Sequence, residues 1–188
     1  MRLGITINFE DTYDIEDISE DLKSFYFASI DKNGSPIRLQ VRIEDNKNKF
    51  LPNVFNLAFG PLDDKGDIDD TATIDHQNVS KMYSTILLGA LTFLRANPNK
   101  VMGIDGSNLV RACLYYRLFQ HNYSYLLQYF DVFGVKFYIR LLRGREKGDP
   151  FVTDNEDLAA QPFRIEKGLV IPKNKMSNYF MFRLPNKA

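Results

Sequence analysis

Tryptophan is absent from this chain of 188 residues, and cysteine and histidine are scarce, with only Cys113, His76 and His121. A single cysteine excludes an intramolecular disulfide and a cysteine-based zinc cluster, and it favours a reducing compartment. No run approaches the roughly 20 apolar residues that cross a bilayer, and the first residues lack the apolar stretch of a signal peptide. We therefore expect a soluble, cytoplasmic protein without a membrane partner.

Complete catalytic and cofactor motifs are also missing. There is no phosphate-binding loop of the Gly-x-x-x-x-Gly-Lys-Ser/Thr type. Cys113 and His121 would share a helix face, but their Cα atoms would lie about 12 Å apart, too far for a catalytic pair. The acidic segment from Asp63 to Asp70 lacks the spacing of an EF-hand and has the composition of a turn. We expect no cofactor and no metal ion.

The composition that remains is that of a packed globular protein. Hydrophobic residues make up 44% of the chain, aromatic residues 13% and charged residues 26%. This length suits a single domain, for which we expect a core over about 22–142 and a C-terminal arm over 143–188. The net charge of zero conceals an asymmetry: residues 1–75 carry eight Lys and Arg against sixteen Asp and Glu, whereas residues 100–147 carry eight against three.

The first half of the chain has the pattern of a strand meander. In 37–43, Ile37, Leu39, Val41 and Ile43 alternate with Arg38, Gln40 and Arg42, which predicts a strand with one face buried and the other wetter. The segment 25–30 precedes it across a turn at 32–35, so the two form a hairpin. A second hairpin is predicted from 54–60 and a polar strand over 68–74. The acidic stretch 10–21 is interpreted as a surface segment or a short helix.

Helical periodicity begins in the second half. Apolar residues recur at spacings of three and four from Val79 to Leu94, with Asp75 as the expected N-cap and a stop near 97–99. A strand over 100–105 leads into a second long helix that Ser107 caps and that 121–122 interrupts, and a strand over 135–141 follows. The order ββββαβαβ predicts an α+β fold, with two helices on one face of a mainly antiparallel sheet. The arm after 142 is predicted to be irregular, except for a short strand near 179–183.

The most suggestive cluster lies at the start of the second helix. Ser107 follows Gly106, and Arg111 and Tyr115 come one and two turns later on the same face. Free amide groups at a helix start, a hydroxyl and a guanidinium together suit a phosphate or a carboxylate. The structural alternative is that Arg111 pairs with an aspartate of the acidic half, Asp69 or Asp70.

A second candidate site is a group of basic residues, which would form a positive surface that could meet a polyanion or an acidic protein. The alternative is that the acidic and basic segments face each other or are solvated. The basic residues are Lys136, Arg140, Arg143, Arg145 and Lys147.

Several of these features together resemble a family of small bacterial proteins of unknown function. They are the run 55–60, Asp69-Asp70, the helix end at Asn97-Pro98, and the element Gly-Ser-x-x-x-Arg-x-x-x-Tyr that begins at Gly106. The resemblance spans about residues 25–141, and the last element is its most specific part. It is similar to proteins found in accessory, mobile or defence-related two-gene cassettes, which implies a role of the toxin–antitoxin or phage-defence kind.

Two functions from different classes follow. The first is a non-catalytic interaction component that binds a partner protein or nucleic acid through the charged surface. The second is a metal-independent ribonuclease or nucleotide-acting enzyme that uses Ser107, Arg111, Tyr115 and the Asp69–Asp70 pair, because arginine, tyrosine and carboxylate groups can perform acid–base chemistry without histidine. The sequence does not decide whether the protein is an enzyme, and it leaves the oligomeric state open.

Overall fold

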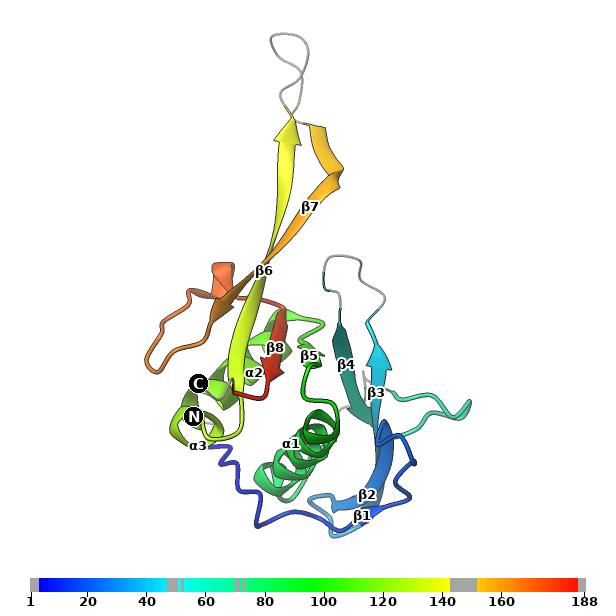
Figure 1. Ribbon diagram of the computed structural model, residues 1–188. Helices are drawn as coiled ribbons and strands as arrows, with labels where there is room; N and C mark the ends of the chain where they lie inside the picture. The colour runs from blue at the N-terminus through cyan, green and yellow to red at the C-terminus, as the bar shows by residue number, and fades with distance from the viewer. Residues whose placement is uncertain are drawn as a thin grey trace.

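The computed structural model describes residues 4–46, 51, 53–69, 72, 74–142 and 152–185, and it is α+β as predicted. Eight strands form one sheet in the order β1-β2-β3-β4-β5-β8-β6-β7, in which only the β4–β5 pair is parallel (Figure 1). The strands are β1 (Ile15–Glu16), β2 (Ser24–Ile30), β3 (Pro36–Asp45), β4 (Val54–Gly60), β5 (Val101–Asp105), β6 (Asp131–Leu142), β7 (Val152–Arg164) and β8 (Tyr179–Arg183). The helices are α1 (Val79–Ala96), α2 (Leu109–His121), α3 (Tyr123–Leu126) and the 3₁₀ turn η1 (Lys173–Lys175).

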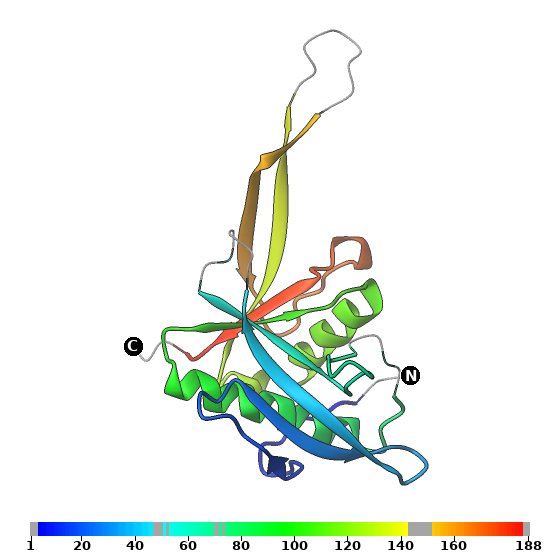
Figure 2. The ribbon, with the colours of Figure 1, turned by 90° about the vertical axis from the view of Figure 1, so that its right-hand side faces the viewer.

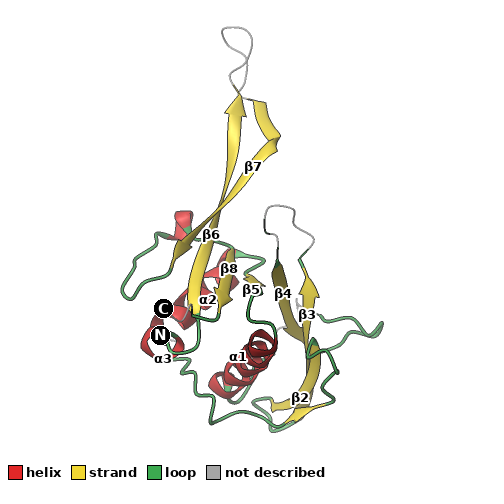
Figure 3. Ribbon diagram, in the orientation of Figure 1, coloured by secondary structure: helices red, strands yellow, loops and turns green. Residues whose placement is uncertain are grey.

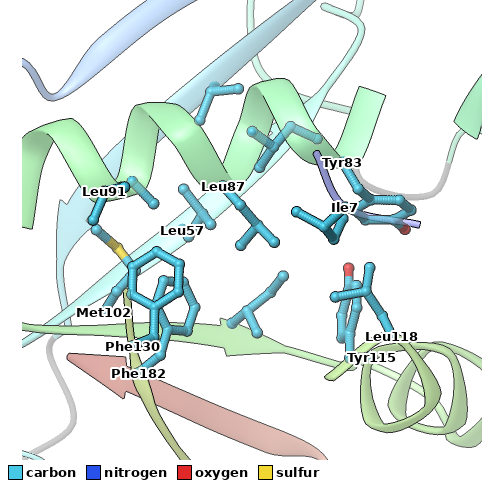
Figure 4. Packing of buried hydrophobic residues seen from close by; sticks show 14 of the residues in the cluster. Ile7, Leu57, Tyr83, Leu87, Leu91, Met102, Tyr115, Leu118, Phe130 and Phe182 are labelled. Carbon is cyan, nitrogen blue, oxygen red and sulfur yellow. The ribbon is translucent and has the colours of Figure 1, made fainter. Parts of the chain in front are cut away.

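One hydrophobic cluster joins the two long helices to the sheet. It unites buried residues of α1 and α2 with inward residues of β2 to β5 and β8, so both helices pack on one face of the sheet, as predicted. In Figure 4, Leu87 and Leu91 of α1 face Met102, Phe130 and Phe182 across this core. Figure 3 shows the same arrangement coloured by secondary structure. A smaller cluster that includes Val135 and Met181 forms a second, separate group of buried residues.

Strand β3 follows the predicted alternation with two departures. Leu39, Val41 and Ile43 are buried and Arg38 is exposed, which confirms the strand, but Ile37, which was also expected to be buried, is only half-buried. Gln40, expected on the wetter face, is buried. Its amide donates to Ser24 Oγ at 3.0 Å, and its carbonyl oxygen accepts from Arg42 Nη2 at 2.9 Å. These bonds satisfy the buried amide, so a polar residue is tolerated there.

The predicted second hairpin is wrong. Between β4 and α1 the described residues form no strand, only two isolated bridges, one from Leu62 to Ile68 and one from His76 to Asp31. The turn at 63–67 is confirmed, because the Asp63 carboxylate accepts from the backbone N–H groups of Lys65 at 2.8 Å and Asp67 at 2.9 Å. The two-residue β1 supplies an additional strand within the acidic segment 10–21. The described residues between Gly60 and Val79 therefore connect β4 to α1 without adding a strand to the sheet.

The C-terminal part is more regular than the sequence suggested. The strand predicted near 179–183 is confirmed as β8, but it lies inside the sheet between β5 and β6, and Phe180 and Phe182 are fully buried. Strand β7, which had not been predicted, pairs with β6 along a hairpin that projects far from the body of the molecule (Figure 2).

The N-terminal segment is held by side chains rather than by a neighbouring strand. Backbone N–H groups of Thr6, Asn8 and Tyr13 donate to hydroxyls of α1 residues at 2.9 to 3.0 Å. The N–H of Ile7 donates to the side chain of Asn122 at 2.8 Å. This places Ile5 and Ile7 in the core. No helix in the described part of the chain is long and apolar enough to cross a membrane.

Candidate ligand-binding pocket

A pocket of about 390 Å³ opens where the two parallel strands separate. The pairing of β4 with β5 runs from Val54–Val101 to Asn56–Gly103, after which β4 continues to Gly60 and β5 to Asp105. The carboxyl ends of parallel strands joined through a helix are a common place for ligands, because the chain leaves the sheet in different directions there. The connection 61–78 and the beginnings of α1 and α2 complete the walls.

All the described residues of the predicted cluster line this pocket. They are Asp69 from the β4–α1 connection, Ser107 from the turn between β5 and α2, and Arg111 and Tyr115 from α2. Asp70 lies outside the described residues. Arg111 and Asp69, which were predicted to lie near each other, therefore line the same pocket.

Ser107 and Arg111 are in contact, but Ser107 does not cap the helix as predicted. The N-cap of α2 is Asn108, whose side-chain oxygen accepts from the N–H of Arg111 at 3.0 Å. Similarly, Asn78 and not Asp75 caps α1. Because Asn108 performs the capping, the Ser107 hydroxyl is left to accept from Arg111 Nη1 at 3.2 Å. This bond fixes the half-buried guanidinium beside an exposed hydroxyl.

Gly106 permits the tight start of α2, as its position suggested. A Cβ at this residue would lie 2.7 Å from both the N and the Cα of Ala112, which is closer than such atoms approach. The Gly106 N–H also donates to the Asn178 carbonyl at 2.6 Å, which ties the end of β5 to the chain just before β8. The pocket wall thus depends on a backbone-to-backbone approach that a side chain would prevent.

Asp69 is positioned by the backbone around it. Its N–H donates to the Pro61 carbonyl at 2.9 Å, and its Oδ1 accepts from the N–H of Ala72 at 3.1 Å. Its own carbonyl lies against Gly60, where a Cβ would be only 2.8 Å away. These contacts hold the half-buried carboxylate at the rim of the pocket.

Two buried tyrosines form the inner wall. The rings of Tyr83 and Tyr115 meet edge to face with centroids 6.4 Å apart (Figure 4). Burial, reinforced by the neighbouring Tyr115, raises the pKa of Tyr83, and the nearby Arg111 guanidinium opposes that rise. The Tyr83 phenol therefore stays protonated at neutral pH and can donate a hydrogen bond.

Sequence reasoning missed three polar residues of the pocket: Asn56, His76 and Asp105. His76 Nδ1 lies 2.9 Å from the hydroxyl of Ser29, which is fully buried in β2. Burial lowers the pKa of His76 below its ordinary value of 6.5, although the carboxylates of Asp31 and Asp75 oppose the shift. The imidazole is therefore neutral near pH 7. The only signal in the sequence was that His76 follows Asp75, the expected N-cap of α1, and this carried no expectation about a site.

The predicted basic surface is described only in part. Lys136 is exposed on β6. The side chain of Arg140, together with residues Arg143, Arg145 and Lys147, lies outside the described part of the structure. Cys113 and His121, which the sequence analysis judged too far apart for a catalytic pair, are not among the residues that line the pocket. Among the residues described, no group of three or more His, Cys, Asp or Glu side chains is arranged to hold a metal ion.

Comparison with known proteins gives a family but no activity. The chain matches none of the curated proteins and none of the solved structures with which it was compared. A model of a family of unknown function, DUF6934, matches residues 10–158. This confirms the resemblance to a family of unknown function that was inferred from the Gly106-Ser107, Arg111 and Tyr115 element. The chain belongs to the DUF6934 family.

Proposed function

We propose that the protein binds a small nucleotide-like ligand in the pocket at the ends of β4 and β5. The observation that carries this proposal is the convergence of Asp69, Ser107, Arg111 and Tyr115 on one cavity of about 390 Å³. A cavity of this size, mostly apolar with a few convergent polar groups, has the ordinary character of a small-molecule site.

The charges in the pocket suit a ligand with two different ends. Arg111 and the Ser107 hydroxyl, next to the amide groups at the start of α2, favour a phosphate. The carboxylates of Asp69 and Asp105 favour hydroxyl or amino groups that donate hydrogen bonds. A ribonucleotide carries both kinds of group, whereas inorganic phosphate carries only the first.

The walls offer a surface for a flat ring. Phe59, Tyr83 and Tyr115 line the pocket beside aliphatic residues of β4 and α1. The ring of Phe59 meets that of Tyr83 edge to face, with centroids 5.8 Å apart. Aromatic side chains bind bases through stacking and edge contacts with little dependence on base identity.

The same pocket supports the catalytic version of the proposal, a metal-independent ribonuclease or nucleotide-acting enzyme. His76 supplies a neutral imidazole, the form that accepts a proton, and Arg111 supplies a fixed positive charge for a phosphoryl oxygen. The buried Ser29 orients the imidazole through Nδ1. His76 is thus the residue we would test first for proton transfer.

Calorimetric titration with nucleoside monophosphates, nucleosides and inorganic phosphate tests the binding proposal. We expect monophosphates to bind and the other two to bind at least tenfold more weakly. Arg111→Ala should reduce the affinity by about tenfold or more, the scale of one charge-assisted contact. Arg95→Ala, which removes an exposed arginine from the last turn of α1, is the matched control and should bind as the parent does. No binding of any monophosphate, or equal losses in both variants, would refute the proposal.

The second candidate is an interaction component of a toxin–antitoxin or phage-defence module in a bacterial cytoplasm. The observation in its favour is the long β6–β7 hairpin, which projects from the body where a partner protein can reach both its faces (Figure 1). A toxic component should arrest growth when expressed alone, and the product of the adjacent gene should relieve the arrest. Replacing 136–161 by a short turn should abolish that relief while the body stays folded. Unaltered growth in every combination would remove this candidate.

A further inference from the structure

A second hollow, of about 480 Å³, lies at the base of the projecting hairpin. It forms where β8 begins: Val135 pairs with Tyr179, and beyond that point β6 continues into the hairpin while the chain before β8 turns away. We call it the hairpin-base groove. Its lining residues are Val135, Lys136, Phe137, Lys175, Met176, Ser177 and Asn178.

The charged residues that the structure describes in this groove are all basic. Lys136 of β6 and Lys175 of η1 are both exposed, and none of the described lining residues is acidic. The ammonium group of Lys136 lies 4.8 Å from the centroid of the Phe163 ring, a cation–π contact that steadies the lysine without neutralising its charge. The groove therefore differs from the first pocket, where two carboxylates accompany the arginine.

A buried hydroxyl in the groove has no hydrogen-bond partner among the residues that the structure describes. Ser177 is only 5% exposed, and its Oγ makes no hydrogen bond. Leaving a buried polar group unsatisfied costs roughly 1–3 kcal/mol. Such a hydroxyl, in a groove that two lysines also line, is suited to donate to an anionic oxygen, which the exposed side-chain amide of Asn178 can also contact.

We propose that the hairpin-base groove binds the backbone phosphates of single-stranded nucleic acid. Phe137, whose side chain leaves β6 on the face opposite to that of Lys136, is 42% exposed and lines the groove. A base can stack on its ring while the phosphates reach the ammonium groups along the edge of the strand. A positive groove with an exposed aromatic residue is the usual arrangement for single strands. The groove binds this ligand irrespective of what occupies the first pocket.

The position of the groove also allows one strand to reach both sites. The Gly106 N–H donates to the Asn178 carbonyl at 2.6 Å, so a residue of the groove directly adjoins the turn that carries Ser107. The two sites therefore both adjoin the junction between the end of β5 and the start of β8, and a strand long enough to pass this junction can contact both.

The test uses the full chain and fluorescence anisotropy with labelled 12-nucleotide single-stranded RNA and DNA, a duplex of the same sequence and inorganic phosphate as competitor. We expect the single strands to bind at low salt and the duplex to bind more weakly. The double variant Lys136→Gln/Lys175→Gln should raise the Kd at least tenfold. It should also lower the slope of log K against log salt by about 1.4, because each neutralised phosphate of a single strand contributes about 0.7.

Two further variants and a control make the outcome specific. Phe137→Ala should weaken single-strand binding by about tenfold, the scale of one lost stacking contact. Ser177→Ala should weaken it severalfold without destabilising the fold, because the hydroxyl has no partner to lose. The control is Arg95→Gln/Lys167→Gln, which removes the same charge from exposed residues that do not line the groove and should bind as the parent does.

Several results would overturn the proposal. They are an absence of single-strand binding at about 20 mM salt, equal affinity for duplex, displacement by millimolar phosphate, or equal losses in the lysine and control variants. Circular dichroism on each variant establishes that it is folded. Titration of the lysine variant with a nucleoside monophosphate separates the two sites. If the variant still binds the monophosphate, the first pocket is intact, whatever the result of the groove experiment.

Discussion

The N-terminal segment offers the sharpest test of how this fold is held together, through the side chain of Asn122. Its Oδ1 accepts from the N–H of Ile7 at 2.8 Å, and its Nδ2 donates to the carbonyls of Ile5 at 2.9 Å and Leu118 at 2.8 Å. All of these groups belong to residues less than 6% exposed. Because Ile5 also lines the ligand pocket, the amide links the segment to the candidate site.

The expected loss of stability follows from the buried groups that Asn122→Ala leaves without hydrogen-bond partners. Asn122→Ala removes the partners of the Ile5 carbonyl and the Ile7 N–H, and each buried group left unsatisfied costs about 1–3 kcal/mol. We expect a loss of about 2–4 kcal/mol, a large part of the 5–15 kcal/mol that a domain usually has. Asn122→Asp keeps one acceptor but loses both donations and buries a charge, so it should destabilise the protein at least as much at neutral pH.

Urea denaturation followed by circular dichroism measures the free energy of unfolding, and hydrogen exchange reports on the Ile7 amide directly. Protection of that amide should fall in Asn122→Ala. The control is Gln128→Ala. The side-chain amide of Gln128 is exposed, and its one described hydrogen bond, to the Ser124 carbonyl, is 3.5 Å long. This substitution should change stability by less than about 0.5 kcal/mol. A loss in Asn122→Ala no larger than in this control would refute the account of the N-terminal segment.

Two other substitutions test the pocket walls. Gly106→Ala forces α2 away from the end of β5, so it should cost about 1–3 kcal/mol in urea unfolding and weaken ligand binding, while Gly4→Ala, with open space around its Cβ, should change neither. Burial lowers the pKa of His76 in the folded protein below its ordinary value of 6.5. The unfolded chain therefore binds the proton more readily than the folded protein does. As the pH falls below 6.5, proton binding to His76 favours unfolding, so the free energy of unfolding decreases. The melting temperature should therefore drop less between pH 7.5 and pH 5.5 in His76→Gln than in the parent, and an identical drop would contradict the assignment.

Local patterns accounted for most of the regular structure. The alternation in 37–43 predicted β3, the spacing from Val79 to Leu94 predicted α1, and 121–122 marked the break between α2 and α3. Helix boundaries were less certain, because Ser107 and Asn108 can both cap and only their backbone conformations decide between them. Gln40 was misjudged because its partner, Ser24, lies on the neighbouring strand.

The candidate site was predicted only in part, because some of its residues come together through contacts between segments that are far apart in the sequence. Ser107, Arg111 and Tyr115 lie on one helical segment, so their spacing alone placed them together. Asp69 was anticipated through its acidic character, and it does line the same pocket. His76 and Asp105 were not, since nothing near them in the sequence distinguishes them from turn or surface residues.

The sequence by itself determined the α+β class, the two long helices, the β2–β3 hairpin and the helical cluster that ends in the pocket, because each depends on contacts between residues close in the chain. Tertiary structure alone decided that β8 enters the sheet between β5 and β6, and that β4 and β5 run parallel and separate to open the pocket. Strand order depends on pairing between segments far apart in the chain, as when Phe182 of β8 meets Met102 of β5, and no local period encodes such pairing.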